Sequence, residues 1–255
     1  MERHPITVTI ITLNEENNIK NAIGSAQGWA NEVLVVDAGS QDRTVELSEE
    51  LGARVLRNPW RGYGHQKNFA QSAASNEWVL NIDADERITP DLKKEIDEIL
   101  LSSNSPFNGF EIPRKTFYLG MWVRHGGWYP NYLVRLAKKK NSNWTEAEVH
   151  ESLKVTGPIG KLRSPLEHYT FNSISEQVET NLRYSRKGFD ELKKRGQKPS
   201  IFKLMTKPLG KFLETYFIKK GFRDGLLGFI ISVNAAHSMF LKYAYFFEDE
   251  ISGKK

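Results

Sequence analysis

The 255-residue chain contains no cysteine. Disulfide bonds, thiolate zinc sites and a cysteine nucleophile are therefore excluded, and stability must come from a hydrophobic core. At this length a full core can be buried, and 39% hydrophobic with 26% charged residues is an ordinary globular composition. A chain without cysteine is also in keeping with a reducing compartment, so we expect a cytoplasmic protein.

Two glycine-rich phosphate-binding motifs are missing as well. Neither Gly-x-Gly-x-x-Gly after the first expected strand nor Gly-x-x-x-x-Gly-Lys-Ser/Thr occurs, which disfavours dinucleotide oxidoreductases and P-loop enzymes. No charged segment with an apolar stretch behind it opens the chain, because residues 1–5 lead directly into a β-branched run. No nucleic-acid-binding motif is recognisable, and we do not expect nucleic acid as a partner.

Apolar residues change their spacing repeatedly along the first hundred residues. Apolar, largely β-branched runs predict buried strands at residues 6–12, 32–36, 54–56 and 78–82. Helical spacing alternates with them, at residues 18–29, 44–51, 65–74 and 91–101. The last of these helices has a recognisable start: Thr89 suits the N-cap, Pro90 the first helical position and Asp91 an acidic first turn. This alternation predicts an α/β fold with a doubly wound, mainly parallel sheet.

The pattern changes after residue 106. Short extended segments at residues 109–112, 117–123 and 132–137 predict a mixed or antiparallel extension of the sheet. Helical periodicity returns at residues 175–195, 209–219 and 226–248. We therefore expect a helical carboxyl-terminal region.

Polar side chains follow each of the four predicted strands, where ligands of open α/β sheets bind. They are Asn14 and Glu15, Asp37 and Ser40, Asn58, and Asp83 with Asp85. Any one of these groups can be only a turn or a helix cap. Their coincidence at four strand ends favours one crevice, and Asp83 with Asp85 suits Mg²⁺ or Mn²⁺, which leave positions free for water and phosphates.

A series of short sequences resembles the family 2 glycosyltransferases of the GT-A fold. They are TLNEE at 12–16, VVDAGSQDRT at 35–44, GHQKN at 64–68 and NIDADE at 81–86. Within that family the chain is most similar to bacterial lipopolysaccharide core glycosyltransferases of the β-1,4-glucosyltransferase type. GWYPN at 127–131, VRL at 134–136 and VHE at 149–151 are similar to the acceptor half of that subgroup.

The resemblance implies a domain organisation. Residues 1–105 would form a nucleotide-sugar-binding α/β half, and residues 106–170 the acceptor-binding and catalytic half of the same domain. Residues 171–255 would form the helical region, which either associates with a membrane or forms oligomers.

The resemblance also implies roles for the strand-end residues. Glu15 and Asp37 would contact the nucleoside, with Thr12, Asn14 and Ser40 beside them. Asp85 would ligate a divalent cation bound to the diphosphate, and Asp83 would serve both ribose and metal, with His150 a further candidate ligand. Lys67 lies where the family has a basic residue near the phosphates, and Arg135 would bind the diphosphate or an acceptor phosphate. These cations would screen the charge that grows on the leaving diphosphate.

A general base must take the proton of the attacking acceptor hydroxyl. Glu146, Glu148, His150 and Glu151 are the candidates in the expected region. The VHE match favours Glu151, with Glu148 as the alternative. On a strand His150 and Glu151 would point to opposite faces, so only one would face the crevice.

An aromatic, glycine-rich segment is the candidate acceptor site. Aromatic faces stack on sugars, and glycines allow close approach of a backbone to a ligand. The candidate acceptor residues are Trp122, His125, Trp128 and Tyr129. Core packing is the alternative role for the tryptophans. His168 is either a ligand close to the metal or a structural histidine.

The carboxyl-terminal third is basic and apolar. Residues 186–223 hold 12 lysines and arginines against 3 acidic residues, within a net charge of +5. Residues 226–247 are apolar, but Asn234, His237 and Lys242 make a membrane span improbable. We expect a helical hairpin on the anionic inner face of the cytoplasmic membrane, or packing against the sheet domain or a second subunit.

The sequence leaves three hypotheses about the function. The first is an inverting, metal-dependent transfer of a hexose from a nucleotide-diphosphate sugar to a hydroxyl of a glycolipid or oligosaccharide acceptor, foremost lipopolysaccharide inner core. The second replaces that acceptor by a polyprenyl phosphate, which needs no general base. The third is a nonenzymatic module that binds anionic membranes or nucleic acid, which leaves the strand-end acids unexplained.

Overall fold

The structure is a computed structural model and describes residues 4–102, 105–146 and 151–253. The chain forms two compact units. The sheet unit comprises Met1–Arg114 and Asn131–His168, and the helical unit comprises Lys115–Pro130 and Tyr169–Lys255.

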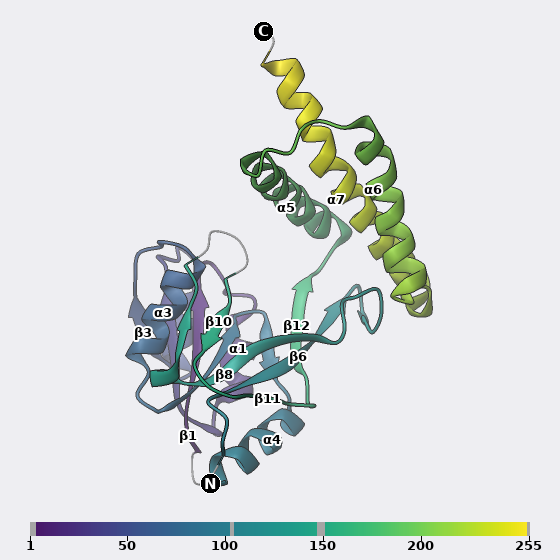
Figure 1. Cartoon of the computed structure of the whole chain (residues 1–255). Helices are drawn as coiled ribbons and strands as arrows, with labels where there is room; N and C mark the ends of the chain where they lie inside the picture. Colours follow the sequence, from purple (N-terminus) through teal and green to yellow (C-terminus); the bar gives the residue numbers. More distant parts are fainter. Residues whose placement is uncertain (1–3, 103–104, 147–150, 254–255) are drawn as a thin grey trace. The chain divides into compact units, whose positions relative to one another are not determined.

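The centre of the sheet unit is a set of parallel strands in the order β3-β2-β1-β4 (Figure 1). The strands are β1 (His4–Thr12), β2 (Ala30–Asp37), β3 (Arg54–Arg57) and β4 (Trp78–Asp83). All four coincide with predicted strands. The carboxyl ends of β1, β2 and β4 are adjacent, because Thr12 pairs with Asp37 and Ile11 pairs with Asp83.

Helices cover both faces of these strands. On one face Ile6, Val8 and Ile10 pack with α1 (Ile19–Ala26) and α4 (Pro90–Leu101), through Ile19, Ile23, Leu92 and Ile96. On the other face Leu34 and Val36 pack with Ala70 of α3 (Tyr63–Ala73). The shorter α2 (Thr44–Glu50) lies between β2 and β3 in the chain. Thr89 caps α4 as predicted, since its side chain accepts a hydrogen bond from the Leu92 backbone N–H at 3.2 Å. The doubly wound arrangement is therefore confirmed.

The sheet continues beyond β4 with strands of mixed direction, as predicted. Strand β8 (Asn131–Lys138) is antiparallel to both β4 and β6 (Gly109–Tyr118), and the order then runs to β12 (Leu166–Phe171) and β5 (Glu86–Ile88). Short pieces complete this region: β7 (Met121–Trp122), η1 (Lys139–Asn141), β9 (Ser142–Trp144), β10 (Leu153–Val155) and β11 (Ile159–Lys161). The sequence did not predict β5 or β9–β12, because segments of three to six residues carry too little periodicity.

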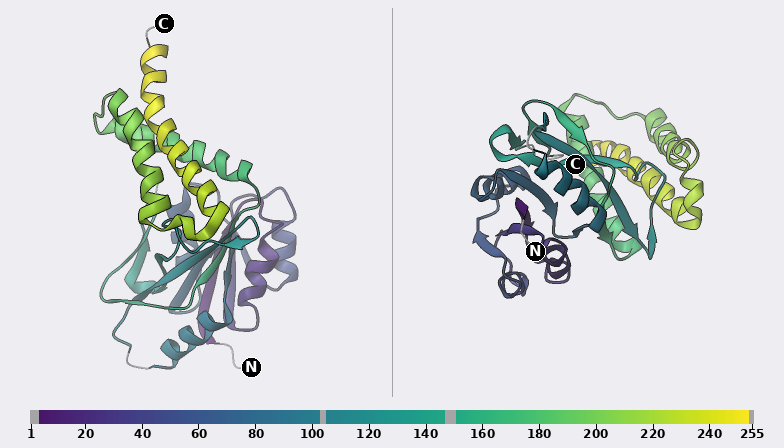
Figure 2. Two further views of the ribbon diagram at one scale, coloured as in Figure 1. Left: turned by 90° about the vertical axis from the view of Figure 1, so that its right-hand side faces the viewer. Right: turned by 90° about the horizontal axis from the view of Figure 1, so that it is seen from below.

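The helical unit contains α5 (Ile174–Lys194), α6 (Ile201–Leu213) and α7 (Gly225–Ser252). A π-helical turn, η2 (Glu214–Ile218), and a 3₁₀ turn, η3 (Gly221–Asp224), connect α6 to α7. Helices α6 and α7 lie side by side, and α5 packs along the other part of α7 (Figures 1 and 2). Among the described residues one helical stretch, Gly221–Ser252, is long and apolar enough to cross a membrane, judged by length and composition alone.

Two features of this unit differ from expectation. Helix α6 begins at Ile201 and not at residue 209, since the Ser200 side chain caps it, and Pro208 lies inside the helix. Residues 115–130 group with the helices and not with the neighbouring strands. Asp224 holds this segment, because its Oδ2 accepts hydrogen bonds from the backbone N–H groups of Arg124 (3.0 Å) and His125 (2.8 Å).

Candidate functional site

The loops after β1 and β2 are joined by side-chain hydrogen bonds. Asp37 is buried, and its Oδ1 accepts from the backbone N–H groups of Gly39 (2.9 Å) and Ser40 (3.0 Å). The hydroxyls of Thr12 and Ser40 donate to its Oδ2. These bonds bring Thr12, Asp37 and Ser40 together at the carboxyl edge of the sheet. The sequence predicted this group as part of the nucleotide site.

Asn14 and Glu15 are joined to the same edge. The Asn14 backbone N–H donates to Ser40 Oγ at 2.9 Å, and its Oδ1 accepts from the Gln41 backbone N–H at 2.8 Å. Glu15 is partly buried, and burial raises the pKa of its carboxyl; a hydrogen bond from Asn18 opposes this rise, and the charges of Asp85, Asp42 and Asp83 add to it. Glu15 thus lies close enough to Asp83 and Asp85 for their charges to add to the rise in its pKa that burial causes.

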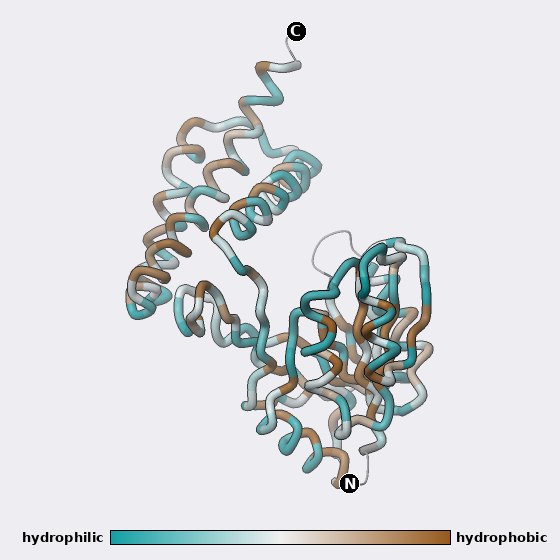
Figure 3. The backbone as a smooth tube through the Cα atoms, turned by 180° about the vertical axis from the view of Figure 1, so that it is seen from behind, coloured by the Kyte–Doolittle hydropathy of each residue, from teal (hydrophilic) through white to brown (hydrophobic). Residues whose placement is uncertain are grey.

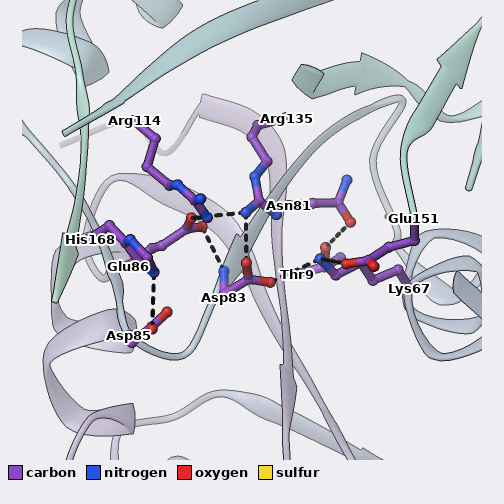
Figure 4. A network of polar contacts seen from close by, with 10 residues as sticks. All are labelled: Thr9, Lys67, Asn81, Asp83, Asp85, Glu86, Arg114, Arg135, Glu151 and His168. Atoms are coloured by element: carbon purple, nitrogen blue, oxygen red, sulfur yellow. Dashed lines mark hydrogen bonds and ion pairs between the residues drawn. The ribbon is translucent and has the colours of Figure 1, made fainter. Parts of the chain in front are cut away.

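Asp83 is the centre of an ion-pair network at the end of β4 (Figure 4). Its Oδ1 lies 3.0 Å from Lys67 Nζ, and its Oδ2 lies 2.6 Å from Arg135 Nη2. Burial opposes ionisation of Asp83, but Arg135 and Lys67 outweigh it and hold the Asp83 pKa well below 3.8. The carboxylate is therefore charged at neutral pH, and both of its oxygens contact cations.

Glu86 is the second acid of this network and is fully buried. Its Oε1 accepts from Arg135 Nη2 at 2.8 Å and lies 3.5 Å from Arg114 Nη1, while its Oε2 accepts from the Asp83 backbone N–H at 2.8 Å. Glu86 thus positions Arg135 and the turn that carries Asp83. Arg114 was missed from the sequence, because nothing in its local pattern shows that β6 places it beside Glu86.

Asp85 lies apart from those cations and pairs with a histidine. Its Oδ2 is 3.1 Å from His168 Nε2, and both side chains are partly exposed (26% and 12%). The pairing of β12 with β5 explains the contact, since His168 lies opposite Glu86 in the register of the two strands. The sequence left the role of His168 open, and the structure places it beside the predicted metal ligand.

This pair has the chemistry of a partial site for a divalent cation. Carboxylate and imidazole groups are ligands for Mn²⁺, and Mg²⁺ takes one or two carboxylates with water and substrate phosphates. Within the described part of the chain, no group of three or more histidine, cysteine, aspartate or glutamate side chains is placed to hold a metal ion. Asp85 and His168 have donor types that fit two ligands of a divalent cation.

Glu151 lies on the other side of Lys67. Its Oε1 is 3.4 Å from Lys67 Nζ, which also lies 4.6 Å from the centre of the Trp144 ring. The Glu151 side chain is 23% exposed and that of Lys67 only 5%. The structure thus brings the predicted base next to the predicted phosphate-binding lysine. Glu148 and His150 lie outside the described residues, and Glu146 is exposed.

The four predicted acceptor residues lie in the helical unit, where three of them have clear structural contacts. His125 Nδ1 is 2.7 Å from Asp224 Oδ1, and the Trp128 ring stacks on Tyr118 with 6.0 Å between ring centres. Trp122 packs edge-on against Phe117 at 5.0 Å. Tyr129 is partly buried. Their role in acceptor binding stays a prediction.

Comparison with known proteins identifies the family. The family model for glycosyl transferase family 2 matches residues 7–104. An uncharacterized glycosyltransferase of Rickettsia typhi is 37% identical over 249 residues, covering 94% of this chain and 85% of the relative. The lipopolysaccharide core biosynthesis glycosyltransferase LpsC of Rhizobium meliloti is 31% identical over 251 residues, covering 96% and 92%.

A solved structure with a local likeness is glucosyl-3-phosphoglycerate synthase from Mycobacterium tuberculosis, in complex with Mn²⁺, uridine diphosphate and glucosyl-3-phosphoglycerate. It is 28% identical, with a TM-score of 0.35, and the match spans 46% of this chain and 45% of the solved one. The chain thus spans less than half of that protein.

The doubly wound sheet, the acids at its carboxyl edge and the full-length relatives together define a glycosyltransferase. The chain belongs to glycosyltransferase family 2, and its fold is the GT-A fold with a helical carboxyl-terminal region. The sequence-based predictions of family, fold and enzymatic class are confirmed. A purely nonenzymatic binding module is excluded by the same findings.

Proposed function

We propose that this enzyme transfers a hexose, with inversion at the anomeric carbon, from a nucleotide-diphosphate sugar to a hydroxyl of a glycolipid of the lipopolysaccharide inner core. Similarity to LpsC over nearly the full length of both chains supports the choice of acceptor. A glycolipid acceptor would place the reaction at the cytoplasmic face of a membrane.

One observation carries the proposal: Lys67 contacts both Asp83 (3.0 Å) and Glu151 (3.4 Å). An inverting transfer needs a cation at the leaving diphosphate and a base for the attacking hydroxyl, on opposite sides of one anomeric carbon. Lys67 and Glu151 lie on different elements, α3 and the segment before β10, and would supply these two groups once the donor sugar separates their 3.4 Å ion pair.

The reaction balances with these residues. The acceptor oxygen forms a bond to the anomeric carbon while its proton passes to the Glu151 carboxylate. The bond between the anomeric carbon and the diphosphate oxygen breaks, and its electron pair stays on the diphosphate. Lys67 and Arg135 would screen that charge. Arg135 has the donors to do so, since its Nε and Nη1 are buried with no hydrogen-bond acceptor among the described residues.

Asp85 and His168 would hold the divalent cation, which when bound neutralises charge on the diphosphate. Asp83 would contribute through Lys67 and Arg135, whose positions it sets, and through the ribose. Thr12, Asn14, Glu15, Asp37 and Ser40 would surround the nucleoside, with Glu15 and Asp37 as acceptors of its hydrogen bonds. Trp122, His125, Trp128 and Tyr129 remain the candidates for acceptor binding.

The first test is a thermal-shift screen of nucleotide-diphosphate sugars with and without Mg²⁺ or Mn²⁺. A ligand that binds only the folded state raises the apparent stability. We expect one nucleotide sugar to stabilise the enzyme only when the metal is present, and to act as donor for a lipopolysaccharide core acceptor. Stabilisation that is indifferent to metal would contradict the metal-dependent mechanism.

A polyprenyl phosphate is the alternative acceptor. The unused N–H groups of Arg114 and Arg135 favour it, because they suit an additional phosphate. A phosphate acceptor needs no general base. Transfer to polyprenyl phosphate that survives replacement of both Glu148 and Glu151 would establish this alternative.

A further inference from the structure

We propose that α6, η2, η3 and the first turns of α7 form a peripheral docking surface for an anionic lipid bilayer. We call it the apolar face and define it by eight side chains: Phe202, Met205, Leu209, Leu213, Phe217, Ile218, Phe222 and Leu226. The inference concerns the helical unit alone and does not depend on the proposed acceptor.

The apolar face is exposed to an extent that core packing does not explain. Phe202 and Ile218 are both 75% exposed, and Leu226 is 74% exposed. Phe202, Met205, Leu209 and Leu213 recur at intervals of three and four residues, so they share one side of α6. Figure 3 shows hydrophobic residues along α6 and the adjoining part of α7, whereas α5 is largely hydrophilic. Contiguous exposed apolar surface of this kind marks an interaction site.

Basic side chains accompany the apolar face. Six lie between residues 203 and 223: Lys203, Lys207, Lys211, Lys219, Lys220 and Arg223. Glu214, the single acid of that segment, pairs with Lys211 (3.1 Å) and Lys219, and the next acid along the chain, Asp224, pairs with His125 (2.7 Å). The stretch of chain that carries the apolar face therefore has net positive charge, which is the composition of an interfacial anionic-lipid site.

A bilayer fits this surface better than a second copy of the chain. In a twofold dimer the same patch meets itself, so Lys220 and Arg223, which lie in the same stretch as Phe217, Ile218 and Phe222, would approach like charges of the second copy. Anionic headgroups neutralise those cations, and the apolar side chains enter the acyl boundary. Lysine stems extend along such a boundary and keep the ammonium group in the headgroup layer.

The contacts of α7 favour docking on the membrane over crossing it. Asn234 donates to Gln177 of α5 at 2.6 Å, and Ser238 Oγ lies 2.8 Å from Ser185 Oγ. Further along, Arg186 pairs with Glu248 (2.9 Å) and Lys193 with Asp249 (2.7 Å). If α7 crossed a bilayer, the charged α5 that packs along it would enter the hydrocarbon too, at high cost.

The test is flotation of the full chain with phosphatidylcholine vesicles that contain or lack phosphatidylglycerol. The triple variant Phe202→Ser/Met205→Ser/Leu209→Ser removes the α6 part of the apolar face. The matched control Leu101→Ser/Ile159→Ser/Ile251→Ser removes three exposed apolar side chains elsewhere (76%, 43% and 67% exposed). We expect wild type and control to float with anionic vesicles, and the triple variant to lose at least about tenfold in affinity.

A charge variant, Lys207→Glu/Lys220→Glu/Arg223→Glu, gives an independent test. It should lose binding to anionic vesicles while its helical circular dichroism is unchanged. If the apolar variant fails to fold, this charge variant alone tests the docking proposal. Wild type that does not float, or both variants floating like wild type, would overturn the proposal. A solution dimer that the triple variant dissociates, with no vesicle binding by wild type, would assign the face to a second copy instead.

Discussion

Charged side chains at the end of β4 divide into two groups with different partners. Asp83 and Glu86 contact Lys67, Arg114 and Arg135, whereas Asp85 contacts His168. Two acids that a sequence motif places side by side therefore have different environments. Replacing each of them should produce a different defect.

Replacing Asp83 with asparagine should lower stability in a pH-dependent way. The folded-state pKa of Asp83 lies below 3.8, so its ion pairs stabilise the protein above that pH and the contribution is lost as pH falls below it. We expect Asp83→Asn to cost on the order of 1–3 kcal/mol at pH 7, since it leaves two buried cations poorly paired. Urea unfolding of both proteins from pH 7 towards pH 3 should show the difference shrinking.

Asp91→Asn is the matched control for that experiment. Its carboxyl is 81% exposed and only 3.9 Å from Lys94, so its removal should change stability little at any pH. A pH-independent loss in Asp83→Asn would mean that the ion pairs are not its cause.

Replacing Asp85 with alanine should remove metal dependence without unfolding the protein. The side chain is partly exposed, and among the residues drawn in Figure 4 it pairs only with His168. We expect the Mn²⁺ concentration needed for donor-dependent thermal stabilisation to rise by at least about tenfold in Asp85→Ala and in His168→Ala. Glu86→Ala should instead lower the melting temperature of the metal-free protein. It removes no metal ligand, but it takes one carboxylate partner away from the buried Arg135.

Replacing Glu151 with glutamine should separate binding from transfer. The amide keeps the size of the side chain but cannot take a proton, so transfer should fall by about 10²–10⁴-fold. The dissociation constant of the donor, measured by calorimetry with metal present, should change little. Equal losses of binding and transfer would remove Glu151 from the role of base, and Glu98→Gln, exposed on α4, is the control.

Helix α3 illustrates how an element positions the site. It carries Lys67, and its first turn is pressed against the segment after β9: a Cβ on Gly64 would lie 2.0 Å from the Thr145 carbonyl oxygen. Asn68 fixes the same contact, since its side chain donates to the Trp144 carbonyl (2.9 Å) and accepts from the Trp144 N–H (2.7 Å). The position of Lys67 therefore depends on close backbone packing.

Replacing Gly64 with alanine should move α3 and displace Lys67. We expect a loss of about 1–3 kcal/mol in stability, as for other overpacked sites, together with weaker donor binding. Gly24→Ala in α1 is the control, because nothing lies within 4 Å of the added Cβ, and it should stabilise the helix slightly. Unchanged stability and donor binding in Gly64→Ala would show that the contact is not required.

Charge is distributed unevenly over the chain, and this has a consequence for the protein as a whole. The net charge is only +5, but the segment around the apolar face is strongly basic. Binding to anionic vesicles should therefore weaken as salt rises towards about 1 M, where the screening length falls to about 3 Å. Catalysis on a water-soluble acceptor fragment should respond less, because the Lys67 and Arg135 ion pairs are buried. Vesicle binding that salt does not change would mean that apolar insertion alone drives it.

The sequence by itself determined the order of elements, the family and the edge of the sheet that carries the site. Periods of two and 3.6 residues are local, so they identify β1–β4 and α1–α4 without knowledge of the rest of the chain. The placement of Asp37, Asp83 and Asp85 also follows locally, because each comes directly after a buried strand, and parallel strands end at one edge. The motif series then identified family 2.

Only the tertiary structure decided which side chains meet across long separations. His168 reaches Asp85 because β12 pairs with β5, and Arg114 reaches Glu86 because β6 and β5 lie on either side of β12 in the sheet. The grouping of residues 115–130 with the helices depends on Asp224, about a hundred residues downstream. Such contacts are set by strand register and packing between distant segments, for which a local pattern holds no information. The exposed side of α6 was decided in the same way, since α7 covers one side of that helix and leaves the other exposed.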